Sequence, residues 1–182
     1  MSAQAGERAK SAIERARAVR LMLFDVDGVL TDGRIYLSDR GEETKAFNSR
    51  DGQGIKLLRE SGIRVGLISA RNSRTVDRRA TELGIELVRQ GASDKARTFA
   101  ELLGGLKLRA AEAGYMGDDL ADLPVLTRCG FAASVPSAPE AVRTRVHYVA
   151  LAGGGDGAAR EVCEFILAAQ DALDHAVSKY LV

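Results

Sequence analysis

Short apolar runs alternate with stretches of helical periodicity along most of the chain. The runs at 21–26, 63–69, 85–90, 113–119 and 131–135 have the length and composition of buried strands, and 147–151 is typical of an edge strand. Between them, apolar positions at helical spacing predict helices over 51–62, 73–83, 95–103, 120–129, 139–145 and 156–173. This alternation predicts one α/β domain over residues 1–182: a three-layer, doubly wound parallel sheet with helices on both faces.

Three segments stand apart from this alternation. Residues 1–19 alternate charged residues with Ala and Ile, which predicts a solvated helix or arm. Residues 33–49 contain the turn sequence "SDRG" between two short apolar segments, which predicts a protruding β-hairpin. Residues 153–182 begin with "GGGDG" and end in an amphipathic helix, and we interpret the glycines as a flexible tail.

Composition limits the kinds of partner and cellular location that we expect for this protein. The 182 residues carry 26 basic and 25 acidic side chains, so no bulk charge favours nucleic acid or an anionic membrane. No apolar segment of membrane length and no signal peptide is visible. The two cysteines, Cys129 and Cys163, have no metal-ligand spacing. We therefore expect a cytoplasmic protein with reduced, packed thiols.

Polar residues follow several of the predicted strands. Asp25 and Asp27 follow the first, Ser69 ends the second, and Asp118 ends the fourth, while Lys95 lies shortly after the third. Ligands of open α/β sheets bind beyond the carboxyl ends of the strands, so we expect these groups to share one rim. The carboxylates would repel one another without a cation between them, and hard oxygen donors without His or Cys favour Mg²⁺.

This set of groups suits phosphoryl transfer. A carboxylate beside a metal ion, Asp25, is a competent nucleophile, and a carboxyl two residues later, Asp27, can protonate a leaving alkoxide and then activate water. Ser69 can donate a hydrogen bond to a phosphoryl oxygen, and Lys95 can neutralise the charge of Asp25 and the phosphate. Individually, however, Ser69 is typical of a loop hydroxyl and Lys95 of a solvated lysine.

Four ordered motifs resemble those of the haloacid dehalogenase superfamily: "DVDGV" at 25–29, "LISA" with Ser69, "SDKAR" with Lys95, and "GDDLADLP" at 117–124. The resemblance implies that Asp25 is the nucleophile and a Mg²⁺ ligand. It implies that Asp27 is the general acid/base and gives its backbone carbonyl to the metal, and that Asp118 is the third ligand. Asp119 and Asp122 would be ligands or would orient them.

No cap domain fits between these motifs, because only the hairpin, helices and strands lie there. The capless core, the hairpin, "RDGQGIK" and "GGGDGAARE" resemble the family of 3-deoxy-D-manno-octulosonate 8-phosphate phosphatases. That resemblance implies a homotetramer, in which hairpins close neighbouring sites, and a sugar acid phosphate as substrate in lipopolysaccharide precursor synthesis. Substrate contacts would then fall on Asn48, Ser49, Arg50, Asp51, Gly52, Lys56, Arg71 and Arg79, beside Asp27 and Lys95.

Two other functions remain open from the sequence. A phosphatase of nine-carbon sialic-type acid 9-phosphates would carry the same motifs, whereas a phosphomutase normally needs a cap. The same core could also be a non-catalytic scaffold subunit of a sugar-activating enzyme. For single residues such as Arg71 and Arg79, a solvated helix face is the simpler interpretation.

Overall fold

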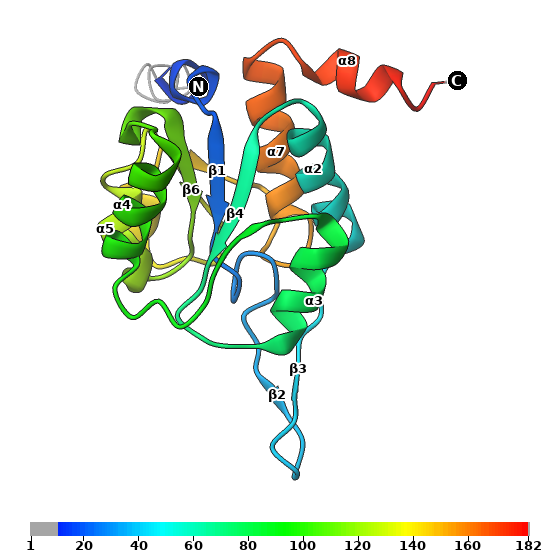
Figure 1. The fold of residues 1–182 in the computed structure, drawn as a ribbon, viewed down its shortest axis with the longest axis vertical. Coiled ribbons are helices and arrows are strands. Elements are labelled where there is room, and N and C mark those ends of the chain that lie inside the picture. Colours follow the sequence, from blue (N-terminus) through cyan, green and yellow to red (C-terminus); the bar gives the residue numbers. More distant parts are fainter. Residues whose placement is uncertain (1–10, 182) are drawn as a thin grey trace.

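The computed structural model describes residues 11–181, so the first part of the predicted N-terminal arm, residues 1–10, and residue 182 lie outside the described residues. A six-stranded parallel sheet forms the centre of the molecule, in the order β5-β4-β1-β6-β7-β8 (Figure 1). Its strands are β1 (Leu21–Phe24), β4 (Arg64–Ile68), β5 (Leu87–Arg89), β6 (Ala113–Met116), β7 (Phe131–Ser134) and β8 (Tyr148–Val149). The predicted parallel sheet, with its edge strand near residue 148, is confirmed.

Helices cover both faces of the sheet (Figure 1). One layer holds α2 (Ser49–Glu60), α3 (Arg74–Leu83) and α7 (Ala158–Ala169), and the opposite layer holds α4 (Lys95–Leu106) and α5 (Leu123–Leu126). The remaining helical segments are 11–17, η1 (Ala110–Glu112), η2 (Leu120–Asp122), α6 (Glu140–Arg143) and α8 (Leu173–Ser178). Within the described residues, a hairpin and α2 lie between β1 and β4, and α3 and β5 lie between β4 and α4, so neither connection holds a separate cap domain.

Strand β1 lies at the centre because its four apolar residues can all be buried. Each is fully excluded from solvent, and the strand pairs in parallel with β4 on one side and β6 on the other. The chain moves outward from β1 to β4 and β5, and then crosses back to β6. The crevice where the strand order reverses therefore opens at the end of β1, directly before Asp25.

Local signals place the helices that flank this crevice. Helix α4 begins at the side chain of Asp94, which accepts a hydrogen bond from the backbone N–H of Arg97, and α3 ends at Gly84, whose φ of 64° is left-handed. Helix α2 starts two residues earlier than predicted, because Asn48 caps it by accepting from the backbone N–H of Arg50. Ser73, at the N-cap position of α3, makes no side-chain capping bond.

The hairpin projects from the carboxyl ends of the strands (Figure 1). Its strands are only two residues long: β2 (Tyr36–Leu37) pairs with the antiparallel β3 (Glu43–Thr44). Three consecutive large apolar residues on it are exposed to solvent, namely Ile35, Tyr36 and Leu37. A two-stranded ribbon with an exposed apolar segment is marginally stable alone, which favours a covering partner.

The glycine-rich segment before α7 is packed, so our interpretation of residues 153–157 as a flexible tail is wrong. The backbone N–H of Gly155 donates to the carbonyl of Val29 at 2.9 Å. A Cβ atom added to Gly154 would lie 1.8 Å from the carbonyl oxygen of Gly28. Only glycine allows the backbone to approach the loop after β1 this closely.

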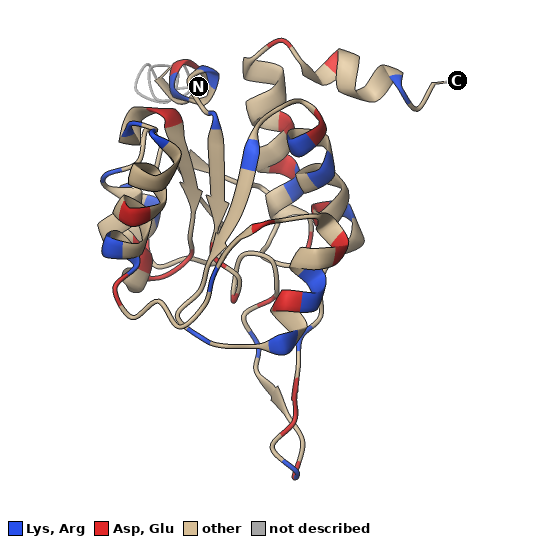
Figure 2. Ribbon diagram, viewed as in Figure 1, with Lys and Arg blue, Asp and Glu red and all other residues tan. Residues whose placement is uncertain are grey.

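Most charged side chains lie on the helices and loops, and the sheet strands β4 and β5 carry charge only at their ends, at Arg64 and Arg89, whereas β1 carries none (Figure 2). Both cysteines are buried and free, as expected of reduced thiols. Among residues 11–181, none of the helices has the length and apolar character needed to cross a bilayer.

Candidate active site at the carboxyl ends of the strands

A cavity of about 270 Å³ lies beyond the carboxyl ends of β1, β4 and β6. Its lining brings together groups from four separate parts of the sequence: Asp25, Asp27, Gly33, Ser69, Ala70, Arg71, Lys95, Asp118, Asp119, Ala121 and Asp122. The expectation that the strand ends share one rim is thereby met, and the cavity defines the candidate site.

Lys95 connects two carboxylates at the floor of this cavity. Its ammonium nitrogen, in the first turn of α4, lies 2.9 Å from Oδ1 of Asp25 and 2.6 Å from Oδ1 of Asp122. All three side chains are buried. Burial alone would lower the pKa of Lys95, but the charges of Asp25 and Asp122 raise it, so the ammonium form is favoured.

The carboxylate of Asp122 orients this floor. Besides Lys95, its Oδ1 accepts from the hydroxyl of Tyr115 at 2.6 Å, and its Oδ2 accepts from the backbone N–H groups of Asp118 and Asp119 at 3.0 and 3.1 Å. With four donors, both oxygens are engaged, which suits the predicted orienting role better than direct metal ligation. Tyr115 was missed from the sequence, since a tyrosine inside an apolar strand gives no catalytic signal.

Asp118 has an oxygen without a partner. Its Oδ1 is buried and accepts no hydrogen bond within the described structure. The other oxygen, Oδ2, packs against Gly28, where an added Cβ would lie only 2.0 Å away. Gly28 also has a φ of 90°, so both the turn after Asp27 and the approach of Asp118 require glycine there. The neighbouring Asp119 instead caps η2 by accepting from Leu120 N–H at 2.7 Å.

Burial and neighbouring charge raise the pKa of two of the acids that line the cavity, Asp25 and Asp118. Burial, followed by the charge of Asp122, raises the pKa of Asp25 to about 6, although Lys95 partly offsets the shift. Burial and the charges of Asp25 and Asp122 raise the pKa of Asp118 to about 7. Without a further positive charge, the site therefore disfavours full ionisation.

These residues fit a hard divalent cation. Asp25, Asp118 and Asp122 each offer a carboxylate oxygen within 4.8 Å of the others. Since Asp122 is saturated by its donors, Asp25 and the unpartnered Oδ1 of Asp118 are the natural protein ligands. An all-oxygen set without His or Cys favours Mg²⁺ or a similar ion over Zn²⁺.

The second acid of the first motif, Asp27, is held by cations from two other elements. Its Oδ1 accepts from the ammonium of Lys45, and its Oδ2 lies 3.9 Å from Nε of Arg71. Glu43 pairs with both cations, 3.1 Å from Lys45 and in a direct hydrogen bond with Arg71. Lys45 and Glu43 were missed from the sequence, because charged residues in a short hairpin usually point into solvent.

Ser69 lies where the second motif predicts. Its side chain is buried at the end of β4, and its Oγ accepts from the backbone N–H of Arg71 at 3.2 Å. The hydroxyl proton is therefore available for an acceptor in the cavity.

The other predicted substrate contacts do not line this cavity. Ser49, Arg50 and Lys56 are exposed on α2. Arg79 donates to the backbone carbonyl of Asn48 at 3.3 Å. For Asn48, Ser49, Arg50, Gly52, Lys56 and Arg79, contact with a substrate stays a prediction.

Asp51 has a clear structural role instead. Its buried carboxylate accepts from the backbone N–H of Arg160 at 2.8 Å and of Gly157 at 3.4 Å, at the start of α7. An acid at a helix N-terminus is favoured both by these donors and by the helix dipole. Asp51 thus ties α2 to α7, and a substrate contact by this side chain also stays a prediction.

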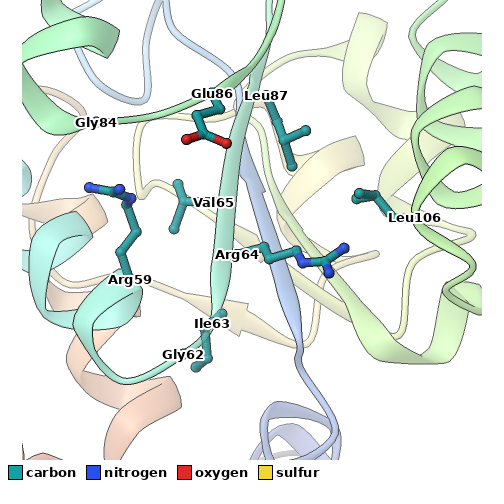
Figure 3. Close-up of a pocket in the computed structure, with 9 residues that line it drawn as sticks. All are labelled: Arg59, Gly62, Ile63, Arg64, Val65, Gly84, Glu86, Leu87 and Leu106. Carbon is teal, nitrogen blue, oxygen red and sulfur yellow. The ribbon is translucent and has the colours of Figure 1, made fainter.

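A larger cavity, of about 440 Å³, lies at the opposite edge of the sheet (Figure 3). It is lined at the amino ends of β4 and β5 by residues that include Arg59, Arg64 and Glu86. Arg59 donates to the backbone carbonyl of Leu83, and no cluster of acids or nucleophiles faces this space. Size alone therefore does not identify the functional site of this fold.

Comparison with known proteins supports the same family as the motifs. No family model matches the chain. The 3-deoxy-D-manno-octulosonate 8-phosphate phosphatase KdsC of Yersinia pestis is 45% identical over 171 residues, covering 94% of this chain and 91% of that protein.

Two solved structures are similar over nearly the whole fold. The phosphatase of Moraxella catarrhalis, in complex with magnesium, phosphate and a KDO molecule, has a TM-score of 0.92 and 41% identity, covering 94% of this chain and 98% of that chain. A putative HAD superfamily (subfamily III A) hydrolase from Legionella pneumophila has a TM-score of 0.94 and 36% identity, covering 99% of both chains. The chain belongs to the 3-deoxy-D-manno-octulosonate 8-phosphate phosphatase family of the haloacid dehalogenase superfamily.

Proposed function

We propose that the protein is a magnesium-dependent phosphatase that hydrolyses 3-deoxy-D-manno-octulosonate (KDO) 8-phosphate to KDO and phosphate, in the cytoplasmic synthesis of a lipopolysaccharide precursor. The observation that carries this proposal is the cavity in which Asp25, Lys95 and Asp118 converge. Family membership supports the substrate, since the relative from Moraxella catarrhalis binds magnesium, phosphate and KDO.

Asp25 is the nucleophile in this proposal. One of its carboxylate oxygens attacks phosphorus, the bond from phosphorus to the sugar oxygen breaks, and an aspartyl-phosphate forms. Lys95, 2.9 Å from Asp25, offsets the charge that accumulates when a phosphate meets a carboxylate. The hydroxyl of Ser69 donates to a phosphoryl oxygen.

Asp27 moves the protons. Its carboxylic acid gives a proton to the departing sugar oxygen, which leaves as an alcohol. The resulting carboxylate then accepts a proton from water as that water attacks the aspartyl-phosphate, which releases phosphate and restores Asp25. The carboxylate of Asp27 lines the cavity, as this role requires.

Asp25, Asp118 and the backbone carbonyl of Asp27 would hold Mg²⁺. When bound, the ion neutralises phosphoryl charge and so makes the approach of an anionic nucleophile to an anionic substrate possible. The unpartnered, buried Oδ1 of Asp118 supports this ligand set. Asp122 keeps its backbone and side-chain donors and does not need to leave them.

Arg71 is the best-supported contact for the sugar acid. It lines the cavity, and 43% of its side chain is exposed, so donors of its guanidinium remain accessible to a carboxylate. The cavity is open because no cap covers it. We propose that the exposed apolar residues of the hairpin form a homotetramer interface that closes the site from a neighbouring protomer.

A panel of sugar phosphates tests the proposal. The purified protein with Mg²⁺ should release phosphate from KDO 8-phosphate with a higher kcat/KM than from nine-carbon sialic-type acid 9-phosphates or neutral sugar phosphates. Preference for a nine-carbon acid would replace the substrate but keep the mechanism. Absence of phosphate release from every member, with a partner enzyme co-purifying, would instead favour the scaffold role.

A further inference from the structure

Lys45 is an unusual lysine for a surface hairpin, because its side chain is only 2% exposed. It follows directly after β3, and its ammonium is placed between two carboxylates, Asp27 and Glu43. A lysine is almost never buried unless it is paired, so this position is set by the two acids around it.

Four charged groups form a closed ring around Asp27. The order around the ring is Asp27, Lys45, Glu43, Arg71 and back to Asp27. Each carboxylate therefore lies between two cations. Each oxygen of Asp27 faces a different cation: Oδ1 accepts from Lys45, and Oδ2 faces Arg71. The orientation of the Asp27 carboxylate is therefore determined from outside its own loop.

The two cations differ in their access to solvent and to the cavity. Arg71 lines the cavity and 43% of its side chain is exposed, so it is accessible to a substrate. Lys45 does not line the cavity, and it donates to Oδ1 of Asp27, which does. Lys45 therefore acts on a substrate only through Asp27.

We propose that Lys45 is a positioning residue that aims the carboxyl group of Asp27 at the leaving-group oxygen, and that Glu43 holds Lys45 in place. This inference rests on the proposed function, in which Asp27 protonates the departing sugar oxygen. It makes the base of the hairpin part of the machinery for leaving-group departure, in addition to its role as an interface element.

The leaving group distinguishes positioning from a merely structural role. A sugar alkoxide departs only with a proton, whereas p-nitrophenolate departs without one. The ratio kcat/KM covers the steps up to departure of the leaving group and excludes hydrolysis of the aspartyl-phosphate. If the carboxyl group of Asp27 no longer points at the leaving-group oxygen, kcat/KM should therefore fall much more for KDO 8-phosphate than for p-nitrophenyl phosphate.

The central variant is Lys45→Met, which keeps the apolar stem and removes the charge. We expect kcat/KM for KDO 8-phosphate to fall about a hundredfold, and that for p-nitrophenyl phosphate to fall less than about threefold. Because Lys45→Met leaves Asp27 and Glu43 facing each other, the double variant Glu43→Gln/Lys45→Met removes that repulsion. It should keep the same substrate-dependent loss.

The matched control is Arg34→Met on the same hairpin. Arg34 is a cation whose side chain is 77% exposed and pairs with Asp32, outside the ring. The variant Arg34→Met should leave kcat/KM unchanged for both substrates. Equal losses for both substrates in Lys45→Met and in the double variant, or no loss in either, would overturn the inference.

A crystal structure of the double variant gives a readout that does not depend on turnover. The carboxylate of Asp27 should move away from its wild-type position, toward Arg71. An unmoved carboxylate would overturn the positioning role even if activity falls. Conversely, a wild-type protein inactive on KDO 8-phosphate would contradict the proposed function, while the orientation of Asp27 would still decide this inference.

Discussion

The hydroxyl of Tyr115 donates a 2.6 Å hydrogen bond to Oδ1 of Asp122, and both side chains are buried beneath the candidate site. The same oxygen accepts from Lys95. Tyr115 thus supports the carboxylate that keeps the lysine beside Asp25. A residue in the middle of an apolar strand contributes to the site without touching the cavity.

Tyr115→Phe should lower both stability and activity. Removing the hydroxyl leaves Asp122 with one donor fewer, which costs about 1–2 kcal/mol in the free energy of unfolding. Looser placement of Lys95 should lower kcat/KM about tenfold. Urea denaturation and steady-state assays measure the two effects.

The control is Tyr148→Phe. Its hydroxyl donates to Glu161 at 2.7 Å, and neither residue lines the catalytic cavity. That variant should lose stability but keep kcat/KM. Equal kcat/KM for Tyr115→Phe and the wild type would argue against a supporting role for Tyr115.

Gly28→Ala should weaken metal binding. Its Cβ would lie 2.0 Å from Oδ2 of Asp118, and the residue has a φ of 90°. Gly41→Ala is the matched control, since Gly41 also has a positive φ of 76° but no atom within 4 Å of an added Cβ. Calorimetric titration with Mg²⁺ should show lower affinity only for Gly28→Ala, and unchanged affinity would contradict the packing argument.

Asp118→Asn should remove the response of stability to Mg²⁺. Binding to the folded state alone raises the melting temperature of the wild type, and chelation reverses the rise. Asp118→Asn should show no such rise, whereas Asp119→Asn, whose carboxylate caps η2, should retain it. A Mg²⁺-dependent rise that persists in Asp118→Asn would remove this residue from the ligand set.

The stability of the metal-free protein should depend on pH, and a comparison with Asp118→Asn isolates the part that Asp118 contributes. The pKa of Asp118 is raised from 3.8 to about 7, so the folded state holds this proton more tightly than the unfolded state does. The resulting stabilisation is fully present below the unfolded pKa of 3.8 and is lost as pH rises through about 7. Between about pH 5 and about pH 8, the metal-free wild type should therefore lose stability relative to Asp118→Asn. Melting curves in chelator give this difference, and parallel curves would contradict it.

Leu37→Asp should break the proposed tetramer. Leu37 lies on the hairpin with 65% of its surface exposed, and a charge there cannot be buried in an apolar interface. Leu151→Asp is the control, because Leu151 is 91% exposed but lies outside the hairpin. Light scattering should report a tetramer for the wild type and Leu151→Asp, and a smaller species for Leu37→Asp. A fully active wild-type monomer would refute the shared site.

The fold and the acids of the site could be predicted from the sequence because both depend on local signals. Buried strands such as β1 are continuous apolar runs; Asp25 follows β1 directly, and Asp118 follows β6 after one glycine. Parallel strands then bring these acids to one edge without any knowledge of long-range contacts.

The remaining features depend on contacts between distant segments. From the sequence alone, Lys45 resembles a solvated hairpin lysine. Only the fold shows that it lies beside Asp27. The sequence does not reveal that the carboxylate of Asp51 lies at the N-terminus of α7, where it accepts from the backbone N–H of Arg160. The glycines at 153–157 resemble a flexible tail, yet Gly154 and Gly155 pack against the loop after β1, a contact that no local pattern encodes.

Trapping a phosphoryl group on Asp25 is the sharpest test of its proposed role as nucleophile. Asp27→Asn should still be phosphorylated by p-nitrophenyl phosphate with Mg²⁺, since p-nitrophenolate needs no proton, but should hydrolyse the aspartyl-phosphate slowly. Mass spectrometry after acid quenching should then find the phosphoryl group on the peptide that contains Asp25. Release of p-nitrophenolate with no phosphoryl group on that peptide, or with the group on another residue, would exclude Asp25 as the nucleophile.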